Sequence, residues 1–331
     1  MVRSLRSVDL NLHVILDPLR LALSVPQAFG LLLRWRPAAI FTTGGYVALP
    51  VLLAAAPLRI PVVMWDGNVV PGRSVRVTAR FAGCLAVAFE STCRALGRKR
   101  RPCFVTGTPI RDPGLIGRAE ARAALGLAAT DRLVLVFGGS QAVRRFNSAV
   151  AEALPRLVDR VHVIHVTGDA GYDQAVAGRE ALPAQRRDRY RPERYLGDGM
   201  AAALAAADLV VGRAGSSTLA EVAAFGLPLV VVPYPHAAGH QQLNAEELVR
   251  AGAARLIDDC DFDAAALLDS AAILDDPARV SAMAAAARSL ARPGAAAAVA
   301  ELVRAAAGRT AYPDEARVEG LSRGLAGGTA S

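Results

Sequence analysis

The chain has 331 residues, of which 53% are hydrophobic, 21% are charged and 5% are aromatic. This length suits two domains that each bury a core, and the composition is too apolar for a disordered chain. The pattern is too irregular for a coiled coil, and no Gly-X-Y repeat indicates collagen. The formal net charge of +8 favours anionic partners: nucleic acid, anionic lipid headgroups or phosphorylated substrates.

The positive charge is concentrated in the first third of the chain. Residues 1–110 hold fourteen basic and four acidic residues, a net charge of +10, so the remainder carries −2. We expect no nucleic-acid partner, because the sequence has no basic strand interleaved with aromatic residues and no helix-turn-helix pattern. An anionic membrane surface or a phosphorylated substrate remains.

Two apolar stretches near the start raise the question of a membrane span. Residues 12–33 include charged residues and a proline, and they predict an amphipathic helix that lies against a membrane surface. Residues 37–57 carry no charge, but two glycines and Pro50 interrupt them where a spanning helix needs continuous backbone hydrogen bonds. The second stretch therefore predicts a buried strand over residues 38–42, a glycine turn and a buried helix.

Short runs of valine, isoleucine and leucine recur along the chain, and each is followed by a glycine-bearing turn and a helical pattern. Continuous apolar strands that alternate with helices are typical of parallel sheets covered on both faces. The predicted fold class is therefore α/β, doubly wound. The further predicted strands are residues 61–65, 84–89, 103–105, 133–137, 161–166, 209–211 and 229–232.

A break in this alternation predicts the domain boundary. The Gly-Thr-Pro-Ile-Arg-Asp-Pro sequence that starts at Gly107 follows a basic stretch, and a new helix over residues 119–125 begins a second series. We expect a first domain over residues 1–112 and a second over residues 113–307 that ends in helices. The Gly/Ala/Ser/Arg-rich residues 308–331 predict a disordered tail.

The sequence gives no sign of a metal, a cofactor or several common catalytic centres. No Walker lysine motif, G-x-S-x-G elbow or H-E-x-x-H helix occurs, which excludes P-loop ATPases, α/β-hydrolases and zincins. His162 and His165 lie inside a predicted strand and are expected to be satisfied core or edge residues. Four cysteines form no C-x-x-C pair, so we expect reduced thiols, with neither a disulfide nor a zinc site: Cys84, Cys93, Cys103 and Cys260.

Two glycine-bearing loops follow predicted strands, where ligands bind in open α/β sheets. Gly138-Gly139-Ser140-Gln141 opens a helix, so its N–H groups and the Ser140 hydroxyl form a candidate anion cradle; a plain strand-to-helix turn is the alternative. The second loop covers residues 212–218, and Ser216 or Ser217 is the expected N-cap of the helix that follows. Glu221, one turn into that helix, either accepts both hydroxyls of a ribose or only complements the helix dipole.

A third polar loop follows residues 229–232. His236, His240, Gln241 and Asn244 lie close together in it, with no carboxylate or cysteine nearby to complete a metal site. These side chains could hydrogen-bond the hydroxyls of a sugar, and a polar surface helix is the alternative.

Taken in order, these segments resemble the MurG family, which transfers N-acetylglucosamine from UDP-N-acetylglucosamine to undecaprenyl-pyrophosphoryl-muramoyl-pentapeptide (lipid I), giving lipid II. The similarity covers about residues 30–290 and depends on several motifs in register. The matching segments are Thr43-Gly44-Gly45-Tyr46, Trp65-Asp66-Gly67-Asn68, Gly107-Thr108-Pro109-Ile110-Arg111, Gly138-Gly139-Ser140-Gln141, Leu196-Gly197-Asp198-Gly199-Met200, Arg213-Ala214-Gly215-Ser216-Ser217-Thr218-Leu219-Ala220-Glu221, and His240-Gln241 with Asn244-Ala245.

The resemblance implies a GT-B fold, in which two Rossmann-like domains face a cleft and the second domain binds most of the donor. It places the Leu196 backbone at the uracil edge and Glu221 at the ribose diol. The lipid acceptor is expected on the first domain, where Asn68 would bind substrate. The remaining donor contacts carried over by position are Arg111, Ser140, Gly215 and Ser216 at the diphosphate, and His240, Gln241 and Asn244 at the sugar and its phosphate.

The activity implied is that of an inverting hexosyltransferase in peptidoglycan synthesis, peripheral on the cytoplasmic face of the cell membrane. No metal is required, because helix N-termini and Arg111 can neutralise the leaving UDP. The alternatives are a related GT-B transferase that glycosylates another lipid, such as diacylglycerol, and a non-catalytic nucleotide-sugar-binding protein.

The sequence also departs from the family pattern. The family's first glycine-rich loop, which ends in histidine, is not found; Trp65-Asp66-Gly67-Asn68 stands for the usual His-Glu-Gln-Asn; and Ala142 replaces a usual glycine. We therefore expect donor binding to be retained and acceptor turnover to be weaker, with Asp66 as the candidate general base.

Overall fold

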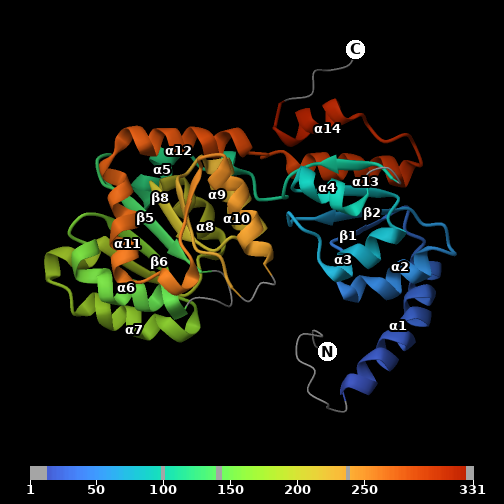
Figure 1. The fold of residues 1–331 in the computed structure, drawn as a ribbon, viewed down its shortest axis with the longest axis horizontal. Helices are drawn as coiled ribbons and strands as arrows, with labels where there is room; N and C mark the ends of the chain where they lie inside the picture. The colour runs from blue at the N-terminus through green and yellow to red at the C-terminus, as the bar shows by residue number, and fades with distance from the viewer. Residues whose placement is uncertain (1–12, 98–100, 139–143, 236–238, 326–331) are drawn as a thin grey trace. The chain divides into compact units, whose positions relative to one another are not determined.

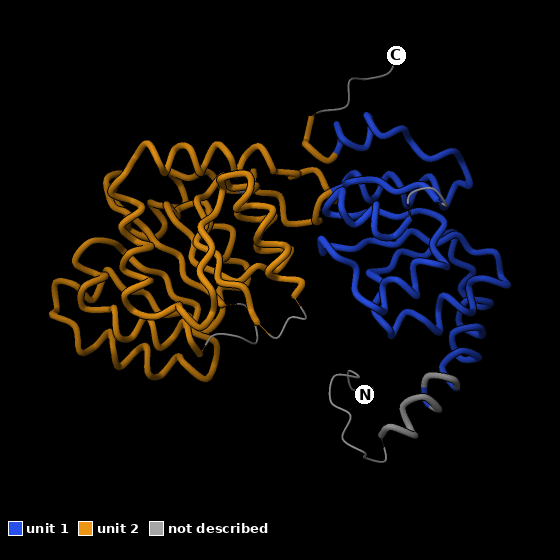
Figure 2. The backbone as a smooth tube through the Cα atoms, viewed as in Figure 1, with its two compact units in different colours: residues 1–106, 297–321, 326–331 blue, residues 107–296, 322–325 orange. Residues whose placement is uncertain are grey.

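The computed structural model describes residues 13–97, 101–138, 144–235 and 239–325. The chain forms two compact α/β units, shown as a ribbon in Figure 1 and coloured by unit in Figure 2. Unit 1 comprises residues 1–106, 297–321 and 326–331, and unit 2 comprises residues 107–296 and 322–325. The chain therefore leaves unit 1 just before Gly107, close to the predicted boundary, and returns to it later.

Unit 1 is built on a four-stranded parallel sheet of order β1-β2-β3-β4. The predicted strand, glycine turn and helix over residues 37–57 are confirmed, because β1 is followed by Gly44 at φ +72° and then by α2. The predicted helix over residues 12–33 is also present, as α1. The elements are α1 (His13–Trp35), β1 (Ile40–Thr42), α2 (Leu49–Ala55), β2 (Val62–Asp66), α3 (Arg73–Thr78), β3 (Cys84–Val87), α4 (Glu90–Leu96) and β4 (Cys103–Val105).

Helices from both ends of the chain cover this sheet. On one face, Leu32 of α1 and Leu52 of α2 pack with β2 and β3 residues. On the other face, Leu302 of α13 (Ala295–Gly308) and Val318 of α14 (Glu315–Ser322) pack with Val63, Cys84, Ala86 and Phe104. The structure thus differs from the expected domain over residues 113–307 and from the expected disordered tail. A parallel sheet is buried on both faces, and the late helices supply the second cover.

Unit 2 contains a six-stranded parallel sheet of order β10-β9-β8-β5-β6-β7. The chain builds the sheet outward from β5 in one direction and then from β8 in the other, which is the doubly wound arrangement predicted. The elements are α5 (Arg118–Ala124), β5 (Leu133–Phe137), α6 (Arg144–Leu157), β6 (His162–Val166), α7 (Asp169–Glu180), β7 (Tyr190–Glu193), α8 (Met200–Ala206), β8 (Leu209–Gly212), α9 (Ser216–Phe225), β9 (Leu229–Val231), α10 (His240–Arg250), β10 (Ala254–Leu256), α11 (Ala264–Ala271) and α12 (Pro277–Leu290).

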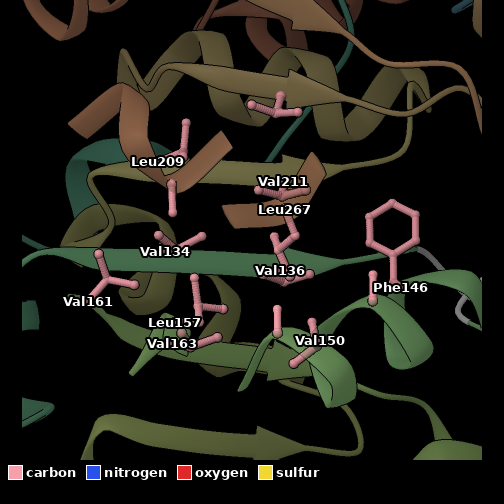
Figure 3. Close-up of a cluster of buried hydrophobic side chains, with 14 of the residues drawn as sticks. Val134, Val136, Phe146, Val150, Leu157, Val161, Val163, Leu209, Val211 and Leu267 are labelled. Carbon is pink, nitrogen blue, oxygen red and sulfur yellow. The ribbon is translucent and has the colours of Figure 1, made fainter. Parts of the chain in front are cut away.

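The two faces of this sheet carry separate hydrophobic clusters. In Figure 3, Val134 and Val136 of β5 lie with Phe146 and Leu157 of α6 and with Leu267 of α11. The opposite face packs alternate strand residues against α5, α8, α9 and α10, with Leu204 and Val222 among the buried side chains. This alternation follows from the period of two along a strand, so loops at the strand ends are held on a rigid base.

A disulfide in unit 1 was not expected from the sequence. Cys93 in α4 and Cys103 in β4 form a disulfide, with their Cα atoms 5.8 Å apart, so the expectation of four reduced thiols was wrong for this pair. The two cysteines are 10 residues apart in the sequence, in a helix and in the strand that follows it.

Cys84 and Cys260 are free. Among the described residues, every helix is too short or too polar to cross a membrane.

Candidate functional site

The candidate site in unit 2 lies at the carboxyl ends of β5 and β8. These strands are neighbours, with Phe137 opposite Gly212, and the chain runs from β5 to one side of the sheet and from β8 to the other. Ligands bind in open α/β sheets at such a reversal of strand order. Residues 139–143 follow β5 and lie outside the described residues, so the predicted contact of Ser140 with a diphosphate stays a prediction.

The N-terminus of α9 has the geometry of an anion site. Gly215 is the N-cap residue, in extended conformation, and Ser216 is the first helical residue; the prediction of Ser216 or Ser217 as the N-cap was wrong. No side chain caps this end, and Leu219 is the first residue whose N–H bonds back into the helix, to the Gly215 carbonyl at 3.0 Å. The preceding N–H groups therefore have no partner within the helix and point out of its end, where a phosphate can accept their hydrogen bonds.

The carboxyl of Glu221, in the second turn of α9, is influenced by the charge of Arg111. Glu221 is half-buried on α9, and burial raises the pKa of its carboxyl, while the charge of Arg111 lowers it. The 3-10 turn Pro113–Leu115, just after Arg111, packs on α9. The segment after Arg111 therefore packs on the helix that carries the carboxylate predicted to hold a ribose.

Arg111 also contacts the segment predicted to meet the uracil. Its Nη1 donates to Asp198 Oδ1 at 2.8 Å and to the Gly197 carbonyl at 3.5 Å. Both acceptors follow Leu196 directly, and the Leu196 carbonyl accepts the Gly199 N–H at 2.7 Å. The structure thus joins Arg111 to the segment that follows Leu196, and the charge of Arg111 acts on Glu221. The diphosphate role of Arg111 stays a prediction.

The polar residues of α10 connect the loops after β8 and β9. Gln241 Oε1 accepts the Tyr234 N–H at 2.9 Å. Asn244 is 1% exposed, and its Nδ2 donates to the Ala214 carbonyl at 3.4 Å. His240 is half-buried as the first residue of α10. These amides position loops in the structure, and their predicted sugar contacts stay predictions; His236 lies outside the described residues.

Arg213 organises the same loops, a role that the sequence analysis did not assign. Its buried Nη1 donates to the Val232 and Pro233 carbonyls and to Asp259 Oδ1, the last at 2.5 Å. The guanidinium also lies over the Tyr234 ring, at 5.4 Å from its centre. Because a planar guanidinium can bond several acceptors at once, one side chain holds the ends of β8 and β9 in register.

Asp66 and Asn68 lie at the carboxyl end of β2 in unit 1. Asp66 is 4% exposed, and its Oδ1 accepts the Asn68 backbone N–H at 3.4 Å and Nδ2 at 3.3 Å. The Asn68 carbonyl accepts the Thr92 hydroxyl at 2.6 Å, which ties this loop to α4. The structure therefore brings the candidate base and Asn68 together, and their action on a substrate stays a prediction.

Two family models match this chain, one in its first part and one in its second part. Residues 7–87 match the glycosyltransferase family 28 N-terminal domain, and residues 133–302 match the glycosyltransferase family 28 C-terminal domain. A solved structure of MurG from Acinetobacter baumannii is 27% identical, with a TM-score of 0.69, over 87% of this chain and 79% of that one.

Two relatives carry the name UDP-N-acetylglucosamine--N-acetylmuramyl-(pentapeptide) pyrophosphoryl-undecaprenol N-acetylglucosamine transferase. The protein from Gloeobacter violaceus is 39% identical over 282 residues, which is 84% of this chain and 76% of that protein. A protein from Desulfitobacterium hafniense is 38% identical over 273 residues, which is 80% of this chain and 73% of that protein.

Proposed function

The chain belongs to the MurG family of glycosyltransferases, and we propose from this membership that it moves N-acetylglucosamine from UDP-N-acetylglucosamine to lipid I, forming lipid II in peptidoglycan synthesis. It is a hexosyltransferase, and its two parallel-sheet units are those of the GT-B fold. The observation that carries the proposal is that Arg111 bonds the segment after Leu196 and acts electrostatically on Glu221, whose helix α9 has an open N-terminus.

The donor is proposed to lie along the strand ends of unit 2. The N–H groups at Ser216 and its neighbours donate hydrogen bonds to the diphosphate, and the Glu221 carboxylate accepts hydrogen bonds from the two ribose hydroxyls. The uracil meets the backbone at Leu196, and Arg111 faces the diphosphate. His240, Gln241 and Asn244 lie at the start of α10, where the sugar would extend from the diphosphate.

The transfer itself is a displacement at the anomeric carbon. An acceptor hydroxyl forms the new glycosidic bond on the face opposite the departing UDP, and the configuration inverts. The leaving diphosphate takes the bonding electron pair, and its charge is stabilised by the N–H groups of α9 and by Arg111. Asp66 is proposed as the base that takes the hydroxyl proton, with Asn68 holding its carboxylate in place.

Unit 1 is proposed to rest on the cytoplasmic face of the cell membrane. Leu31 and Trp35 of α1 are 50% and 73% exposed, and Val47 is 67% exposed. These side chains, with Arg20, border an apolar groove of about 410 Å³ between α1 and α2. Apolar side chains with basic neighbours favour an anionic lipid surface, which is where a lipid-linked acceptor resides.

An acceptor comparison tests the proposal. The whole chain is incubated with UDP-N-acetylglucosamine labelled in the sugar and with lipid I or diacylglycerol, and the lipid-extracted product is analysed. We expect label in a lipid-linked disaccharide from lipid I, with inverted anomeric configuration. Label in diacylglycerol alone would indicate the related lipid transferase. Donor binding by calorimetry without any labelled lipid would indicate a non-catalytic binding protein.

A further inference from the structure

A cavity in unit 2 lies between α6 and α7, under the helices rather than at the strand ends. Its volume is about 290 Å³, and Asn147, Leu154, His165, Gln174 and Tyr190 are among the residues that line it. This size is at the lower limit for ligand pockets. His165 follows Ile164, which faces the α9 side of the sheet, so His165 points to the other side. The cavity therefore lies on the sheet face away from Glu221.

Two side chains that line this cavity each have a buried polar atom with no hydrogen-bond partner among the described residues. The two atoms are His165 Nε2 and Asn147 Oδ1. His165 is 1% exposed, so bulk water does not reach its ring freely. Buried polar atoms are nearly always hydrogen-bonded, because leaving one unpaired is unfavourable. A ligand that bonds both atoms would remove this cost.

The opposite ends of both side chains are fixed. His165 Nδ1 lies 2.9 Å from the Tyr190 hydroxyl, and Asn147 Nδ2 donates to the Thr167 carbonyl at 3.0 Å. Gly171 leaves room for the Asn147 amide, since a Cβ there would lie 1.8 Å from Nδ2. The two unpartnered atoms are thus held in place before any ligand arrives, which lowers the entropic cost of binding.

The cavity is uncharged. None of the described residues that line it is an acid, a lysine or an arginine. Burial lowers the pKa of His165 to about 3, so its ring is neutral at physiological pH. Neither an anion nor a cation would find an opposite charge there.

We propose that the cavity between α6 and α7 binds a small uncharged molecule that hydrogen-bonds His165 Nε2 and Asn147 Oδ1 together, a primary amide being the simplest example. The Asn147 side-chain oxygen needs a hydrogen-bond donor. His165 Nε2 would accept from an amide N–H in one tautomer of the neutral ring and donate to an amide carbonyl in the other. This site is separate from the donor site, and its occupation does not depend on the transfer reaction.

Nuclear magnetic resonance of the whole chain with isotope-labelled histidine tests this site, with acetamide as the probe. The five histidines give few side-chain signals, and His165→Gln identifies the relevant one. We expect a saturable shift of the His165 signal, with Kd in roughly the millimolar range for so small a molecule, and no matching shift at His162.

Two matched substitutions on α7 complete the test. Ala177 is exposed and lines the cavity, whereas Ala170 is exposed and does not. Ala177→Leu should weaken acetamide binding by about tenfold or more through filling the cavity, and Ala170→Leu should leave it unchanged. A linear shift without saturation, or equal saturation in both variants, would overturn the proposal. Both substitutions lie at exposed helix positions, and unchanged thermal unfolding confirms that the variants fold.

Discussion

The carboxyl of Glu221 experiences two opposing effects, and their balance has a functional consequence. Burial raises its pKa and the charge of Arg111 lowers it, and burial is the larger effect. The charged form is the one that accepts two ribose hydroxyls. Because the pKa is raised, Glu221 becomes protonated at a higher pH than an ordinary glutamate. Donor affinity should then decrease with falling pH while the pH is still above the usual pKa of a glutamate.

We expect UDP-N-acetylglucosamine to bind more weakly as the pH falls from neutral toward the ordinary pKa of a glutamate, because the raised pKa of Glu221 makes it take up its proton within that range. Glu221→Gln should remove this dependence and weaken binding by about ten- to a hundredfold, because a hydrogen bond to a charged group contributes roughly 1.5–3 kcal/mol. Calorimetry at each pH measures this, with exposed Glu120→Gln as the control. Equal affinity in Glu221→Gln and in the unsubstituted chain would contradict the ribose assignment.

Substitution of Asp66 should affect the transfer step, whereas substitution of Glu221 should affect donor binding. Asp66→Asn keeps an oxygen for the Asn68 N–H groups but cannot accept a proton from the acceptor. We expect kcat for lipid II formation to fall about 10²–10⁴-fold, the usual contribution of a general base, while the Kd of the donor stays the same. A kcat within threefold of the unsubstituted value would assign the base to another group.

At the scale of elements, the apolar strands could be predicted from the sequence, and the two arginine-containing edge strands of the six-stranded sheet could not. β5 and β4 have the predicted bounds, because each is a continuous apolar run. β7 and β10 were missed: they lie at the two edges of the six-stranded sheet and contain arginines, since one side of an edge strand can face water. The N-cap of α9 was misassigned because a serine is the commoner cap, although a glycine there lets a ligand approach the backbone.

Substitution of Gly215 tests whether a ligand approaches the backbone at the start of α9. The Gly215 φ of −67° is accessible to any residue, and a Cβ would come no closer than 3.8 Å to Thr218 Oγ1. Gly215→Ala should therefore leave the free energy of unfolding unchanged or raise it slightly. Donor affinity should fall by about tenfold, since the added methyl group would stand where the diphosphate meets the N–H groups. Calorimetry and urea unfolding of the same sample separate the two effects.

Gly226 at the other end of α9 is the matched control. It has φ +63°, and a Cβ there would lie 2.6 Å from Arg288 Cγ. Gly226→Ala should lower the free energy of unfolding by about 1 kcal/mol or more and leave donor affinity intact in the folded fraction. If Gly215→Ala instead lost stability and kept its affinity, the diphosphate would have to bind elsewhere.

α1 should provide most of the membrane affinity of unit 1. Replacing Leu31 and Trp35 together with serine should reduce binding to anionic liposomes by about tenfold or more, because two large exposed apolar side chains are lost. Co-sedimentation measures this, and binding should also fall with added salt. Leu290→Ser, on α12 of unit 2, is the control. Binding that depends on neither anionic lipid nor these side chains would contradict the proposed surface.

At the scale of the whole molecule, the path of the chain could not be predicted from the sequence. The Ala-rich pattern after residue 290 predicts helices, but it carries no information about which sheet they cover. The glycosyltransferase family 28 C-terminal domain matches through residue 302, yet most of α13 packs on the sheet of unit 1. Unit 1 is therefore completed by the last helices, so its stability depends on residues synthesised after all of the unit 2 sheet.

Leu302 tests this dependence. It is fully buried against the unit 1 sheet, so Leu302→Ala should cost about 2–5 kcal/mol through lost burial and the remaining cavity. Hydrogen exchange should show the loss at the amides of β2, β3 and β4, with β5 and β8 still protected. Leu267→Ala is the matched control, since Leu267 is equally buried on α11 in unit 2 and should give the opposite pattern. Faster exchange in β5 and β8 on Leu302→Ala, with β2–β4 unchanged, would show that α13 belongs to unit 2. Such a pattern would also mean that the first sheet is covered by something other than the end of its own chain.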